Sequence, residues 1–141
     1  MTSRVRVRSV LKVRETQEGI AKAALAIANN NERLARLAVA AWQAEMAEWG
    51  QGSGSQTAGA FRSWRNQLEA SKAHLDRLRQ GVDQCVQETA HALEEYQIAA
   101  KRVEVLNRLH DRLLERERIE EAAADQIAMD EAAVTLFQRS S

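Results

Sequence analysis

Residues 61–113 read FRSWRNQLEASKAHLDRLRQGVDQCVQETAHALEEYQIAAKRVEVLNRLHDRL. Steps of alternately three and four residues from Phe61 meet sixteen positions, and thirteen of these are apolar. The sixteen positions are Phe61, Trp64, Leu68, Ser71, Leu75, Leu78, Val82, Cys85, Thr89, Ala92, Tyr96, Ala99, Val103, Leu106, His110 and Leu113. A spacing that averages 3.5 residues keeps one stripe of a helix facing a partner helix along its whole length. This stretch therefore predicts a long coiled-coil helix, from about residue 60 to 138.

The residues before it predict a second long helix, from about residue 4 to 49. Its apolar residues also recur three and four apart, and we expect them to form the facing seam: Val10, Val13, Ile20, Ala24, Ile27, Leu34, Ala38 and Ala41. Near Leu34 and Leu37 the pattern shifts toward Trp42, Met46 and Trp49, which resembles a stutter.

Two polar residues, Gln17 and Asn31, interrupt this expected seam. A single buried asparagine commonly fixes the register of a coiled coil at some cost in stability. Asn31 is therefore either a register lock or part of a wet section in which the helices splay.

The residues between the two helices read GQGSGSQTAG (50–59) and include four glycines. Glycine adopts positive φ angles and weakens a helix, so this run predicts a loop. A short loop makes neighbouring helices antiparallel. Folding there places residue 49 opposite about residue 60, and residue 5 opposite about residue 104. We expect an all-α fold: one domain over residues 1–141, a two-helix antiparallel coiled-coil hairpin whose second helix overhangs beyond about residue 105.

Composition agrees with a helical rod and excludes several function classes. The 141 residues include no proline, only 4% aromatic residues, and 20 basic residues against 20 acidic ones. A formal net charge of zero argues against a general nucleic-acid binder. The first fourteen residues hold five cations and no acid. That basic start either contacts an acidic protein or anionic lipid surface, or is a solvated face beside the acidic C-terminal helix.

No pattern indicates catalysis, a cofactor or a metal. Cys85 is the only cysteine and lies on the seam, where a thiol acts as a small apolar group. Glu88 and His91 form the single Glu-x-x-His pair, whereas di-iron bundles need two such pairs and two further glutamates. No apolar run approaches the length of a membrane span. We expect a cytoplasmic protein that is not an enzyme and does not insert into a membrane.

The basic start is followed by VLKVRETQE (10–18), and the second helix carries LLERER (113–118) and AMDEAA (128–133). Together these segments resemble the flagellar FliJ family, the stalk proteins of flagellar export, which are similar to the injectisome stalk proteins of type III secretion. The resemblance covers the whole chain. It implies a non-enzymatic stalk whose paired terminal ends enter the ring of the hexameric export ATPase and promote its assembly. It also implies a link to the cytoplasmic domain of the export gate, a role with export chaperones, and a location in the cytoplasm at the inner membrane.

The resemblance also implies two sets of contact residues. The positions that match the ring-inserting ends are Arg4, Arg6, Arg8, Leu11, Arg14, Arg112, Arg116, Ile119 and Asp130. The positions nearest to the family's gate-contacting series are Trp64, Leu68, Ser71 and Leu75, with leucine where the series has histidine. The alternative hypothesis is a structural coiled-coil scaffold that self-associates, for instance through the overhangs.

Overall fold

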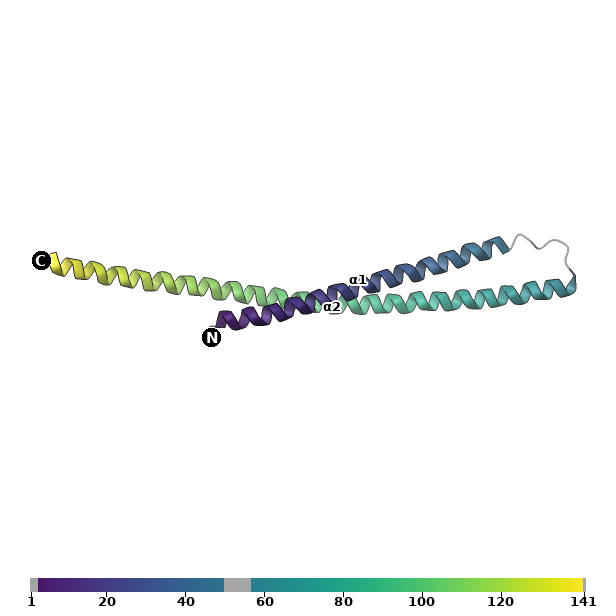
Figure 1. Cartoon of the computed structure of the whole chain (residues 1–141), viewed down its shortest axis with the longest axis horizontal. Coiled ribbons are helices and arrows are strands. Elements are labelled where there is room, and N and C mark those ends of the chain that lie inside the picture. Colours follow the sequence, from purple (N-terminus) through teal and green to yellow (C-terminus); the bar gives the residue numbers. More distant parts are fainter. Residues whose placement is uncertain (1–2, 50–56, 141) are drawn as a thin grey trace. The chain divides into compact units, whose positions relative to one another are not determined.

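The computed structural model describes residues 3–49 and 57–140, and all of these except Thr57 are helical. Helix α1 runs over Ser3–Trp49 and helix α2 over Ala58–Ser140 (Figure 1). The two long helices pack against each other as a helical hairpin, which confirms the all-α class.

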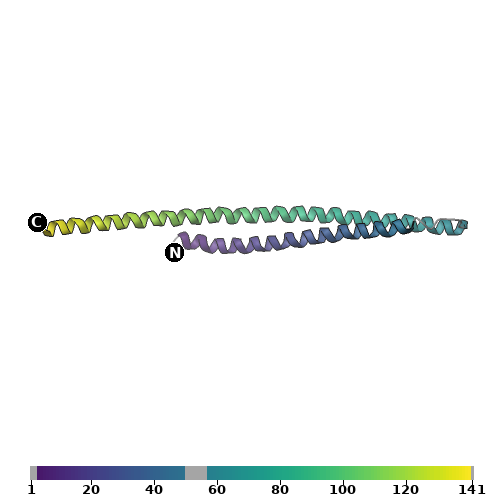
Figure 2. The same cartoon turned by 90° about the horizontal axis from the view of Figure 1, so that it is seen from above.

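The contacts between residues divide the chain into two compact units, each holding a segment of both helices. The terminal unit comprises Met1–Glu18 with Ile98–Ser141, and the loop-side unit comprises Gly19–Gln97. In each unit the two helical segments run antiparallel (Figures 1 and 2). The single-domain assignment stays a prediction.

Helix α2 begins at Ala58, two residues before the expected start at about residue 60. Residues 50–56 of that loop lie outside the described residues. Thr57 is the N-cap: its Oγ1 accepts a hydrogen bond from the Ala60 N–H at 3.2 Å, and its carbonyl accepts one from the Phe61 N–H at 2.9 Å. Because a threonine cap satisfies a free N–H group of the first turn, Ala58 and Gly59 are already helical.

The stripe of α2 that faces α1 is the one that the sequence predicted. Every one of its sixteen positions is buried or half-buried except Phe61, which is 52% exposed. Phe61 lies in the first turn of α2, before coverage begins at Trp64, and its ring lies 6.0 Å from that of Trp64. The most buried positions are Ser71 and Val103.

The seam expected on α1 is wrong for its eight named residues, from Val10 to Ala41, because all of them are exposed. Trp42, Met46 and Trp49, toward which the pattern was expected to shift, do lie in the seam. The stripe that faces α2 also has steps of four and three residues, without a stutter: Val7, Leu11, Arg14, Glu18, Ala21, Leu25, Ala28, Glu32, Ala35, Val39, Trp42, Met46 and Trp49. Three of these positions are charged and half-buried: Arg14, Glu18 and Glu32. The long stem of an arginine such as Arg14 covers apolar surface while its charged head reaches water. The small alanines among them let α2 approach closely.

That close approach is visible in the loop-side unit, where two polar side chains cross between the helices. The Thr89 hydroxyl donates to the Ala28 carbonyl at 3.2 Å, and the Trp42 indole N–H donates to the Ser71 carbonyl at 3.1 Å. The Trp42 ring also meets the His74 ring edge-on, with centroids 4.5 Å apart. These contacts fix the register of α1 against α2 in this unit, because each joins one position on α1 to one on α2.

In the terminal unit the register differs from the expected one. Arg4 forms a salt bridge with Glu117 at 3.3 Å, whereas folding at the loop predicted that residue 5 would lie opposite about residue 104. Side chains tilt toward the N-terminus of their helix, so an arginine and a glutamate on antiparallel helices reach each other across an axial offset. Coverage of α2 therefore continues to Glu117. The overhang, here residues 118–140, is exposed throughout and begins later than expected. Helix α2 extends past the N-terminal end of α1 in both views (Figures 1 and 2).

Candidate functional site

The first turns of α1 present cations to solvent. Arg4, Arg6 and Arg8 are exposed, and the first turn holds no acidic residue. A helix N-terminus carries partial positive charge, so this end is strongly electropositive and suits an acidic partner surface. Arg4 is engaged with Glu117 of the same chain, with 44% and 36% of the two side chains exposed.

The next two expected ring contacts, Leu11 and Arg14, belong to the packing of the terminal unit. Leu11 is only 9% exposed in the seam, so its side chain contacts α2 and not solvent. Arg14 is half-buried, and its Nη1 donates to Gln17 Oε1 at 3.0 Å. Leu11 therefore acts as an anchor for the exposed arginines before it.

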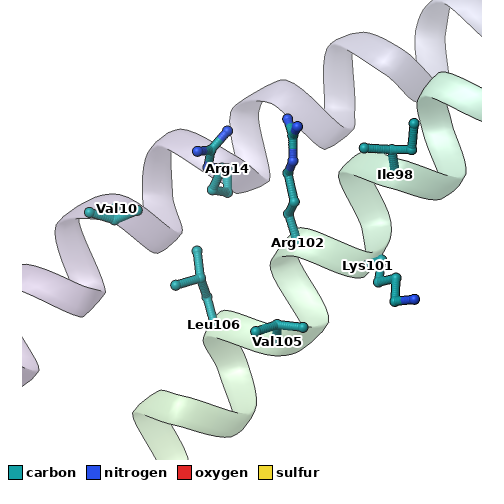
Figure 3. A pocket seen from close by; sticks show the side chains of 7 residues that line it. All are labelled: Val10, Arg14, Ile98, Lys101, Arg102, Val105 and Leu106. Atoms are coloured by element: carbon teal, nitrogen blue, oxygen red, sulfur yellow. The ribbon is translucent and has the colours of Figure 1, made fainter.

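An open groove of about 450 Å³ lies beside this packing, between α1 and α2 of the terminal unit (Figure 3). Its lining residues are Val10, Arg14, Ile98, Lys101, Arg102, Val105 and Leu106. The lining combines four apolar side chains with three cations and no acid. An apolar floor beside basic groups suits the apolar face of a helix that also carries acidic residues.

On α2 the remaining expected ring contacts follow one another along the helix toward the overhang. Arg112 is exposed, and Arg116 pairs with Glu120 at 3.7 Å. Ile119 is exposed, and Asp130 accepts a hydrogen bond from Gln126 at 3.1 Å. Asp130 lies about 21 Å beyond Arg116, at 1.5 Å per residue, so the structure does not gather these residues into one cluster.

The overhang has an acidic and apolar surface. A shallow groove on it is lined by Ile127, Asp130, Glu131, Val134 and Thr135. Large apolar side chains stand in solvent here, including Phe137, which is 75% exposed. Exposed apolar residues in a row beside acids are typical of a helix that binds a partner.

Glu115 and Arg118, the first residue of the overhang, form a bidentate ion pair. Arg118 Nη2 donates to Glu115 Oε1 at 2.7 Å, and Arg118 Nε donates to Glu115 Oε2 at 3.1 Å. The hydrogen bonds and then the charge of Arg118 lower the pKa of Glu115, and the same pair raises the pKa of Arg118. The pair stabilises the helix locally where α1 no longer covers it.

The four expected gate contacts lie in the seam of the loop-side unit. Ser71 is 5% exposed, and its hydroxyl donates to the Gln67 carbonyl at 2.8 Å. Trp64, Leu68 and Leu75 are half-buried. These residues therefore pack against α1, and only the outer parts of the last three reach solvent.

Sequence reasoning missed two features of the terminal unit. One is Glu117 as the partner of Arg4, and the other is the groove. Ile98 and Val105 are seven residues apart and exposed, so they share one helix face. The spacing of Ile98 and Val105 could have indicated an apolar patch on α2. That Val10 of α1 lies beside this patch could be known only from the register of the two helices.

Among residues 3–49 and 57–140, no group of three or more histidine, cysteine, aspartate or glutamate side chains is placed to hold a metal ion. Neither α1 nor α2 contains a stretch long and apolar enough to cross a membrane.

Comparison with known proteins gives one family. No curated protein and no solved structure matches the chain. The family described as Flagellar FliJ protein matches residues 3–141, nearly the whole chain, and it is an export-associated family that does not consist of enzymes. Because the match covers nearly the whole chain, the chain belongs to the flagellar FliJ family.

Proposed function

We propose that this chain is the stalk of a flagellar protein-export apparatus, peripheral at the inner membrane. Its terminal unit inserts into the ring of the hexameric export ATPase and promotes assembly of that ring. The stalk then links the ring to the cytoplasmic domain of the export gate and assists export chaperones. Membership of the FliJ family supports the export role.

The observation that carries ring insertion is the make-up of the terminal unit. It consists of two helical segments, followed by the overhang as a single helix. A ring can admit an end of this kind because no bulky side domain is attached to the described residues. The exposed arginines of α1 and the exposed apolar residues of the overhang supply both charged and apolar contacts.

Ring insertion is tested by a truncation at the residue where coverage of α2 by α1 ends. A chain that ends at Glu117 removes the overhang but keeps the salt bridge to Arg4. We expect the full chain to raise the ATPase rate and the hexamer fraction of a flagellar export ATPase, and the truncated chain to do neither. Circular dichroism checks that the truncated hairpin remains helical. Equal stimulation by both chains would contradict the role of the overhang.

A double substitution separates the apolar contacts from helix length. Ile127 and Val134 lie seven residues apart and line the groove of the overhang. Ile127→Glu/Val134→Glu should abolish stimulation, because a buried charge without a partner is costly in an interface. The matched control, Glu121→Gln in the same helix, should retain it.

For the gate, the proposal assigns contact to the solvent-facing parts of Trp64, Leu68 and Leu75. Binding to the purified cytoplasmic domain of the export gate tests this. Trp64→Ala should weaken binding severalfold. Leu78→Ala, another half-buried seam position, controls for loss of hairpin stability. If both variants bind equally well, the contact lies elsewhere.

A further inference from the structure

Between Ile20 and Ala44 the outward face of α1 carries no charged side chain, and it ends where the exposed Glu45 and Glu48 follow. This neutral face comprises Ile20, Ala23, Ala24, Ile27, Asn30, Asn31, Leu34, Leu37, Ala38, Ala41 and Ala44, and every one of these residues is exposed. Ile20 is 66% exposed and Ile27 63%. At 1.5 Å per residue the face is about 36 Å long, or about three and a half heptads.

The charges of this segment lie on its other faces. Between residues 20 and 44 they are Lys22, Glu32, Arg33 and Arg36. Glu32 pairs with Arg36 at 3.6 Å, and Arg33 lies at the rim, where it donates to Asn30 Oδ1 at 2.8 Å. A solvated helix face normally carries charges, so a long apolar face without them marks a contact surface.

The neutral face has coiled-coil spacing of its own. Ile20, Ala24, Ile27, Asn31, Leu34, Ala38 and Ala41 follow one another at steps of four and three residues. This is the stripe that the sequence predicted as the seam toward α2, and α2 covers the neighbouring stripe instead. The helix therefore has two seams, and one of them has no partner among the described residues.

We infer that the neutral face of α1 pairs with the same face of a second copy of this chain. A charged helix face would bury unpaired charge against it, at a high cost. The outer surface of α2 in this unit is a poor match because it carries charges such as Arg65, Glu69 and Asp76. The face that is neutral, apolar and equally long is the α1 face itself.

Asn31 favours a second copy of this chain, and not an unrelated helix, as the partner of the neutral face. It lies at the midpoint of the stripe from Ile20 to Ala41, so in a twofold pair it meets its own copy whether the helices run parallel or antiparallel. An amide that meets an amide is hydrogen-bonded on both sides, and a single asparagine at a core position fixes the register of a coiled-coil pair. An apolar partner helix would leave this amide unsatisfied.

Sedimentation equilibrium of the full chain tests the inference. We expect a monomer–dimer equilibrium, and Ile27→Glu/Leu34→Glu should raise the dimer dissociation constant about 100-fold or more, since each tenfold corresponds to about 1.4 kcal/mol. The matched control is Val86→Glu/Leu93→Glu, two exposed apolar residues seven apart on α2 of the same unit. Circular dichroism establishes that both variants remain helical.

A cross-link supplies a second readout. In a Cys85→Ser background, Asn31→Cys should form a disulfide between two copies, whereas Ala90→Cys, exposed on α2, should not. A chain that stays monomeric at all concentrations overturns the inference. A dimer that Ile27→Glu/Leu34→Glu does not weaken overturns it as well. Neither result depends on whether the chain stimulates an ATPase, so ring insertion is tested separately.

Discussion

Two stretches of α2 have similar helix-forming residues but different surroundings. From Trp64 to Glu117, one side chain in every three or four is covered by α1. From residue 118 to 140, every side chain is exposed, although isoleucine, valine and phenylalanine continue. The helix does not end where its partner ends, so coverage by α1 is not what makes this segment helical.

Local interactions account for the uncovered stretch. Arg118 pairs with Glu115, Arg116 with Glu120, and Gln126 donates to Asp130, all three or four residues apart. Such pairs each stabilise a helix by about 0.2–0.5 kcal/mol and need no tertiary contact. The apolar residues of the overhang are therefore not required by the fold, which leaves them available for a partner.

The largest expected effect on stability comes from comparing two single variants, each of which places a carboxylate in one of the two stretches. Val103 is 9% exposed and Val134 is 56% exposed. Val103→Asp should lower the free energy of unfolding by about 3 kcal/mol, since it buries a carboxylate without a partner. Val134→Asp should change it by less than about 0.5 kcal/mol. Urea unfolding followed by circular dichroism measures both, and equal effects would remove the distinction between the stretches.

A smaller loss of stability is expected when one hydrogen bond between α1 and the covered stretch of α2 is removed. Trp42→Phe keeps an aromatic ring in the seam but removes the N–H that donates to the Ser71 carbonyl. The expected loss of stability is about 1 kcal/mol, the usual net value of one hydrogen bond. Trp49→Phe, in the same seam, is the control, and its loss should be clearly smaller. Equal losses would mean that ring volume, and not the hydrogen bond, holds α1 to α2 there.

The seam of α2 could be predicted from the sequence because α2 has one dominant apolar stripe. The seam of α1 could not, because two neighbouring stripes share the same spacing. The stripe through Val10 and Ile20 contains no charge, whereas the true seam includes Arg14, Glu18 and Glu32. Periodicity favours the neutral stripe, while the packing of bulky residues such as Trp42 and the close approach of alanines favour the other.

The candidate site was predictable only as far as it depends on one helix. The basic start of α1 and the acidic overhang are visible in the sequence as charge runs. The pairing of Arg4 with Glu117 and the groove beside Val10 depend on which residues of α1 and α2 lie opposite each other. A hairpin's register follows from side-chain reach and seam packing, and the loop position alone did not predict that Arg4 would reach Glu117.

The boundary between the two stretches can be tested at Glu117. Glu117→Gln removes the salt bridge with Arg4 at the last covered position. Because both side chains remain partly exposed to solvent, we expect a loss of about 0.5 kcal/mol at low salt, falling toward zero at high salt. Glu120→Gln, just beyond the boundary, provides the comparison. A loss that does not depend on salt would contradict an exposed ion pair at this position.

The smallest expected effect is a loss of helicity at low pH, and it concerns the Glu115–Arg118 ion pair, which spans that boundary. Arg118 lowers the pKa of Glu115, first by hydrogen bonding and then by its charge. A carboxyl group whose pKa is lower in the folded state stabilises that state above its unfolded pKa, about 4.3 for glutamate, and loses this contribution as the pH falls through the lowered value. Helicity here should therefore decrease slightly below about pH 4. The pKa of Glu115 is measured by following the chemical shift of its carboxyl carbon against pH by nuclear magnetic resonance. Arg118→Gln should return this pKa toward its ordinary value. An unchanged pKa in that variant would assign the shift to another group, and the overhang would then be helical without help from this pair.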